Sequence, residues 1–159
     1  MKIIKRIVLI LVLSFVCGSA FSQSADKLFD KFKDKPGAQV LNINKSMLSM
    51  AISDSTDVQK KKLLENVDSI QILVISKNEA TRNDFIKKSG KMKMSDYETL
   101  LNVNEDDQVM RIYFRDSNDT NGEFILLVVD KEDCVLMKVL GKIALNDMGE
   151  ILNFTLSEN

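Results

Sequence analysis

The sequence predicts an α+β fold: a two-layer sandwich in which helices pack on one face of an antiparallel or mixed sheet of about six strands. Two features support this prediction. Residues 108–143 contain three strand-like segments joined by two polar turns, which is typical of an antiparallel meander. Residues 24–104 alternate segments of helical periodicity with short segments of strand-like composition. The sheet has an apolar face, and we expect the helices to cover it.

The three segments of the meander differ in their hydrophobic pattern. From 109 to 115, apolar residues alternate with arginine and tyrosine, so we expect a half-buried strand with one solvated face. Residues 116–122 are small and polar and end in glycine, which predicts a hairpin. Residues 124–129 are apolar at every position, so we expect a central strand that is covered on both faces. Residues 134–140 are mostly apolar and complete the meander.

The other elements follow from periodicity and from capping residues. We predict further strands at 38–44, 69–75 and 97–104, and helices at 24–33, 47–52, between 57 and about 66, at 78–88 and at 145–153. Ser24 or Asp26 can cap the first helix, and Asn78 can cap a later one. Met47 and Met50 suit an adaptable binding surface, but at helical spacing we favour ordinary core packing.

The N-terminal residues 1–22 have the anatomy of a secretory signal peptide. Basic residues precede an uncharged apolar run over 7–16, and small residues follow, so we predict cleavage between Ser22 and Gln23. The apolar run is shorter than the roughly 20 residues that span a bilayer. We therefore expect an exported protein of the periplasm or cell envelope, with membrane contact only through this segment. The alternative is a lipoprotein anchored at Cys17, although the branched Val16 precedes that cysteine where a small residue is usual.

Residues 23–159 are predicted to form a single domain. The full chain has 22 basic and 23 acidic residues, and the signal peptide removes three basic ones, so the mature domain is mildly acidic. Nucleic-acid binders instead carry concentrated basic surface, so we expect no nucleic-acid partner. Without Cys17, the mature chain retains only Cys134, and a single cysteine cannot form an intramolecular disulfide. We expect Cys134 to be a buried, inert thiol.

The composition narrows the chemistry. The chain has no histidine, which excludes Ser-His-Asp and Cys-His systems and histidine metal sites. Acidic clusters at 105–107 and 132–133 are expected in tight turns, where solvated carboxylates keep ordinary properties. The oxygen-rich segment 116–122 fails both EF-hand registers, and no glycine-rich phosphate loop occurs. We therefore predict no catalytic residue, cofactor or metal site. An enzyme using carboxylates or an oxygen-ligated metal is the alternative.

One surface is a candidate for interaction. Arg111, Tyr113 and Arg115 are expected to align on the solvated face of their strand, and Lys138 to join them. Arginine and tyrosine are enriched in interface cores, so this surface suits an envelope protein, an acidic peptide or another anionic envelope component. The other interpretation, which we favour for this surface, is a routine solvated sheet face, because antiparallel sheets commonly leave one side in water. The export signal together with the missing catalytic constellations predicts a non-catalytic binding or interaction domain.

Several short motifs resemble a known family. They lie at 28–32, 44–48, 96–100 with 103–104, and 134–136 with 141–143. In these motifs and in its layout the chain resembles the DUF4252 family over nearly the whole mature length. The resemblance implies a small exported α+β domain of Gram-negative, Bacteroidetes-type bacteria with no assigned activity. It therefore implies no catalytic residues.

Overall fold

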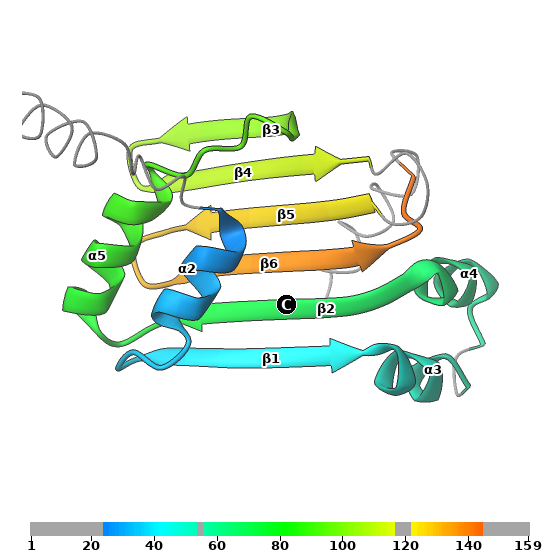
Figure 1. Cartoon of the computed structure of the whole chain (residues 1–159). Helices are drawn as coiled ribbons and strands as arrows, with labels where there is room; N and C mark the ends of the chain where they lie inside the picture. The colour runs from blue at the N-terminus through cyan, green and yellow to red at the C-terminus, as the bar shows by residue number, and fades with distance from the viewer. Residues whose placement is uncertain (1–23, 54–55, 117–121, 145–159) are drawn as a thin grey trace, which may run out of the picture.

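Six antiparallel strands form one sheet in the order β1-β2-β6-β5-β4-β3 (Figure 1). The computed structural model describes residues 24–53, 56–116 and 122–144. The strands are β1 (Ala38–Asn44), β2 (Val67–Ile75), β3 (Glu98–Glu105), β4 (Gln108–Arg115), β5 (Gly122–Val129) and β6 (Cys134–Gly141). The helices are α2 (Ala25–Phe32), α3 (Lys45–Ser53), α4 (Val58–Asn66) and α5 (Glu79–Ser89).

The predicted α+β class is confirmed, and each strand and helix predicted within the described residues is present. The predicted caps are also confirmed: Ser24 accepts a hydrogen bond from the Lys27 backbone at 3.5 Å, and Asn78 accepts one from Thr81 at 2.9 Å. The predicted helix at 145–153 and most of the turn at 116–122 lie outside the described residues.

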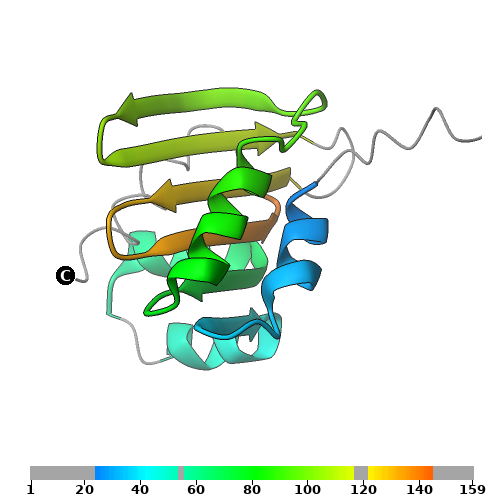
Figure 2. The ribbon, with the colours of Figure 1, turned by 90° about the vertical axis from the view of Figure 1, so that its left-hand side faces the viewer.

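Helices α2 and α5 pack side by side on one face of the sheet (Figures 1 and 2). Phe32 of α2 and Phe85 of α5 are fully buried, and their rings meet edge to face with centroids 5.2 Å apart. Below them lie the residues of the three central strands that point to this face, among them Leu73, Ile125 and Leu136. We call this cluster the helix-side core.

A second core lies on the opposite face. Residues of the same strands that point the other way, such as Phe124 and Met137, are buried there. Helices α3 and α4 contribute Leu48, Ile52 and Leu64 to it. The four described helices therefore contribute to the cores on both faces of the sheet. Helices α2 and α5 form the predicted helical layer.

Strand β4 is buried on both faces, so the expectation of a solvated face is wrong for its middle. Ile112 and Phe114 lie in the second core, as their alternation predicts. Tyr113 points the other way and is only 8% exposed, because it belongs to the helix-side core. By contrast, β5 is central and buried on both faces as predicted, between β4 and β6.

Most of the exposed large apolar residues in the described part of the chain lie at or near the β1 edge of the sheet. Val40 and Leu41 of β1 and Met47 and Met50 of α3 are all more than a third exposed. The expectation that the two methionines fill the core is therefore wrong. Helix α3 instead turns Leu48 and, one turn further along, Ile52 toward the core, and the two methionines lie on its outer side.

Candidate functional site

A buried carboxylate organises a group of polar side chains on the helix-side face. Glu123 is 5% exposed and lies directly opposite Arg115 across the β4–β5 pair, where the two form an ion pair. Tyr97, just before β3, donates its hydroxyl hydrogen to Glu123 at 2.8 Å. The Arg115 guanidinium lies 4.7 Å from the centre of the Tyr97 ring. We call these three residues the Glu123 cluster.

The cluster satisfies its buried charge internally. Glu123 accepts one hydrogen bond from an arginine and one from a phenol, so this buried carboxylate is not left without hydrogen-bond partners. Burial, followed by the hydrogen bond to Glu123, raises the pKa of Tyr97, so the phenol stays protonated and continues to donate. Arg115 is held from two sides while its side chain remains 44% exposed.

Lys138 belongs to a separate contact. It lies on β6, its side chain is 10% exposed, and its ammonium group pairs with Asp26 in the first turn of α2. This ion pair joins α2 to the central sheet. Because Lys138 is paired with Asp26 and largely buried, its role in the described structure is to hold α2 against the sheet.

The four predicted interaction residues are therefore not brought together on one open face. Arg115 is exposed and Arg111 is half-buried, whereas Tyr113 and Lys138 are buried. The sequence reasoning missed Glu123, and the signal that it needed was a lone acidic residue opening an otherwise apolar strand.

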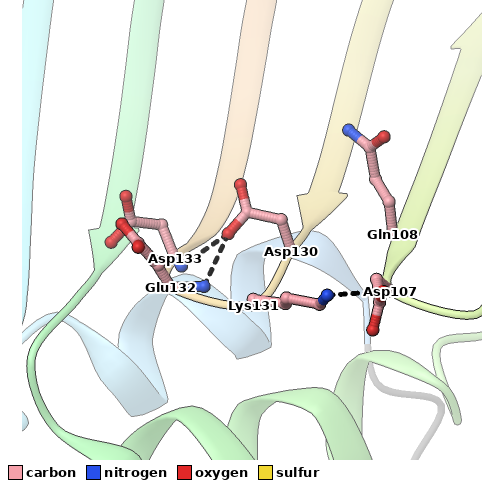
Figure 3. A pocket seen from close by; sticks show the side chains of 6 residues that line it. All are labelled: Asp107, Gln108, Asp130, Lys131, Glu132 and Asp133. Carbon is pink, nitrogen blue, oxygen red and sulfur yellow. Dashed lines mark hydrogen bonds and ion pairs between the residues drawn. The ribbon is translucent and has the colours of Figure 1, made fainter.

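The two predicted acidic turns lie next to each other at one end of the sheet (Figure 3). The β3–β4 turn and the β5–β6 turn border an open depression of about 400 Å³. The residues lining it are Asp107, Gln108, Asp130, Lys131, Glu132 and Asp133. Acidic residues of both turns thus border the same depression. The pairing of β4 with β5 brings the two turns together.

Two of these carboxylates hold the turns together. Asp130 accepts hydrogen bonds from the backbone N–H groups of Glu132 and Asp133, both at 2.8 Å, in a turn stabilised by its own side chain (Figure 3). Asp107 pairs with Lys131 at 2.6 Å across the hollow. Helix α5 also reaches this turn, where Arg82 donates to the Asp130 carbonyl. The depression is open and its carboxylates stabilise turns, which does not resemble the buried cleft that shifts catalytic pKa values.

Within residues 24–53, 56–116 and 122–144, no group of three or more acidic or cysteine side chains is placed to hold a metal ion. Over the same residues, no helix combines the length and the apolar character needed to cross a bilayer.

Cys134 opens β6 and is fully buried, as predicted. Burial raises the pKa of its thiol to about 11, while the nearby Arg82 cation opposes part of the shift. An unfolded thiol titrates near ~8.5. The folded state holds this proton more tightly than the unfolded state does. The contribution of the thiol to the free energy of unfolding is therefore complete below about pH 8.5 and is lost as the pH rises toward 11.

The free energy of unfolding should therefore fall by roughly 2–3 kcal/mol between about pH 8.5 and 11 through this thiol. Urea unfolding across this range measures the fall. Cys134→Ala should flatten the slope, leaving the smaller loss from Tyr97, whose raised pKa acts in the same direction. At neutral pH the native thiol should resist a thiol reagent that labels it in urea. Rapid labelling of the native protein, or an unchanged slope in Cys134→Ala, would contradict this assignment.

A family model described as a domain of unknown function, DUF4252, matches residues 32–151. No curated protein and no solved structure matches the chain. The matched range contains every described strand and the helices α3, α4 and α5.

Proposed function

We propose that this chain, which belongs to the DUF4252 family, is an exported envelope domain that acts by binding an acidic segment of another protein. The observation that carries the binding role is the state of Arg115. Its guanidinium is fixed by Glu123 and Tyr97, yet nearly half of the side chain faces solvent.

A fixed, partly exposed arginine is suited to recognise a carboxylate. A guanidinium has five N–H donors, and the contact with Glu123 leaves donors for a partner. Because the side chain is already ordered, binding costs less conformational entropy than it would for a free arginine. Arg111 lies on the same face of β4 and can add a second cation.

The partner class follows from the number of cations. Anionic membrane surfaces are recognised by clusters of about four to eight basic residues, whereas this face offers Arg115 and the half-buried Arg111. A single well-placed arginine instead suits a carboxylate pair of an acidic peptide. We therefore favour an acidic protein segment over a lipid surface.

Binding of a fluorescein-labelled Glu-rich peptide tests this role. Arg115→Gln should weaken binding about tenfold, the loss of one charge-assisted contact, and rising salt should weaken the wild-type complex. Lys62→Gln removes an exposed cation from α4 and should leave binding unchanged. Circular dichroism must show that both variants fold, because Arg115→Gln leaves Glu123 with Tyr97 alone.

Equal weakening by both variants would mean that net charge and not Arg115 governs binding. An absence of binding to the peptide would overturn the proposal. Vesicles rich in anionic phospholipid form a second arm. Binding to vesicles but not to the peptide would replace the acidic segment with a membrane surface.

Export is supported by the N-terminal pattern and by the start of the fold. Ser24 caps α2, which begins at Ala25, directly after the predicted cleavage between Ser22 and Gln23. Removal of residues 1–22 thus leaves each described element intact. Mass spectrometry of protein from the envelope fraction should find Gln23 at the N-terminus. A diacylated Cys17 would show a lipid-anchored protein, and an intact Met1 would show retention in the cytoplasm.

A further inference from the structure

The two edge strands of the sheet, β1 and β3, differ in how well they are protected against pairing with a further strand. Strand β3 carries the exposed Glu98 and Glu105 at its ends, and its register with β4 is irregular between Thr99 and Leu101. Charged residues and bulges are the devices by which natural sheets prevent edge-to-edge pairing. β1, the other edge, has none of them: its sequence AQVLNIN is uncharged and lacks proline, and it pairs with β2 over seven residues without a break.

The unprotected edge also carries the exposed apolar residues. Val40 and Leu41 at the middle of β1 are 38% and 49% exposed. They point to opposite faces of the sheet, since Val40 lies opposite Leu73 of the helix-side core and Leu41 opposite Ile72. Both faces of the edge therefore offer apolar surface to an added strand. In the described part of the chain, most exposed large apolar residues lie here or on the adjoining α3 and α4.

The hydrogen bonds of β1 show which backbone groups are free for a partner. Ser76 donates to the Gly37 carbonyl directly opposite it, which makes this position a hydrogen-bonded pair. Alternation along an unbroken antiparallel ladder then directs the backbone groups of Leu41 toward β2 and those of Val40 and Asn42 outward. Two residues in the middle of the edge thus present unpaired donors and acceptors.

We propose that β1 pairs antiparallel with β1 of a second copy, so that two sheets join into one. Around a two-fold axis the same edge serves both partners. The register centred on Leu41 uses the whole strand: Leu41 meets its own copy, and Val40 meets Asn42 of the other chain. Val40 and Asn42 are the residues with outward backbone groups, so they exchange both main-chain hydrogen bonds. The two leucines form the closer, non-hydrogen-bonded pair.

Charge favours a second copy as the occupant. No like charges meet anywhere in this register, because residues 38–44 carry none. Lys45, at the end of the strand, is bound by the Val67 carbonyl at 2.9 Å and by Asp68 at 3.5 Å. A β3–β3 pair would instead juxtapose Glu98 and Glu105. Met47 and Met50 follow β1 directly, and Asn44 fixes that turn by accepting from the Met47 backbone at 3.0 Å, which places flexible apolar side chains beside the joined strands.

Sedimentation equilibrium of the mature chain tests the pairing. The wild type should show a reversible, concentration-dependent approach to twice the monomer mass. Asn42→Pro removes an outward N–H without touching the β2 ladder and should give a monomer. Leu41→Lys places two like charges across the axis and should do the same. Leu101→Lys makes the matched change on the β3 edge and should leave the dimer intact.

Disulfide trapping tests the register. Leu41→Cys should form an intermolecular disulfide on mild oxidation, because the pair lies within the Cα distance that a disulfide requires. Gln39→Cys is the control: its copy would lie four positions away, about 13 Å along the strand, out of reach. The native Cys134 is buried and does not contribute.

A wild type that stays monomeric at the highest attainable concentration would overturn the proposal, even if β1 then captured a strand of a different protein. A dimer that survives Asn42→Pro and Leu41→Lys would place the contact on another surface and also overturn it. Trapping through Gln39→Cys instead of Leu41→Cys would reject the proposed register.

Discussion

Phe85→Ala should lower the free energy of unfolding by about 3–5 kcal/mol, which is a large share of the stability of a small domain. Phe85 of α5 is fully buried and meets the fully buried Phe32 of α2 edge to face. Truncation loses the transfer free energy of the ring and opens a cavity between the two helices and the sheet. Urea unfolding followed by circular dichroism measures the loss.

A control variant and a double-mutant cycle separate the ring contact from simple burial. Val58→Ala shortens a side chain that is 79% exposed and should change stability by less than about 0.5 kcal/mol. Phe32→Leu, Phe85→Leu and the double variant form a cycle whose coupling should be about 0.5–1.5 kcal/mol. A loss below about 1 kcal/mol in Phe85→Ala would show that α5 does not pack on the sheet as described.

Gly141→Ala should cost about 3 kcal/mol through a different mechanism, the overfilling of a backbone contact. Gly141 is the last residue of β6, and it lies against the junction at which α4 ends and β2 begins. A Cβ at Gly141 would collide with the Asn66 carbonyl and lie 2.8 Å from the Val67 Cα. These are backbone atoms, so no side chain can move aside. The hydrogen bond from Lys142 to the Asn66 carbonyl, at 2.8 Å, would be disturbed as well.

Gly90→Ala provides the matched control. Gly90 follows α5 with a φ of −63°, and an added Cβ would meet its nearest neighbour, the Ile86 carbonyl, at 3.4 Å. This substitution should be neutral or stabilise by about 0.4–1 kcal/mol, because alanine restricts the unfolded chain. Thermal melts of both variants compare the sites. Similar melting temperatures for the two would contradict the close approach at Gly141.

The sequence predicted most strongly where local chemistry decides the structure. The unbroken apolar run of β5 indicated a central strand, and Ser24 and Asn78 indicated helix starts, because these signals depend on neighbouring residues. β2 begins two residues earlier than predicted. Val67 follows α4 without a turn, and a register shift between Val67 and Ser69 accommodates the junction. Neither glycine nor proline marks that change in the sequence.

The candidate site could be predicted only in part, because its residues meet through strand order. Alternation placed Arg111, Tyr113 and Arg115 on one face of β4 correctly, but it does not show that a helical layer shields the middle of that face. The pairing of Lys138 with Asp26 joins residues far apart in the sequence. Likewise, helical spacing alone does not tell whether Met47 and Met50 turn toward the core or away from it.

The position of β6 between β2 and β5 has a consequence for the order of folding. The inner edge of β2 is paired by β6, with Ile75 opposite Cys134 and Val67 opposite Gly141. The N-terminal half of the sheet thus lacks its neighbour until nearly the whole described chain has been synthesised, and such distant pairings form slowly. Completion of the sheet therefore waits for β6, the last strand of the described chain, because only β6 joins the β1–β2 pair to the other three strands.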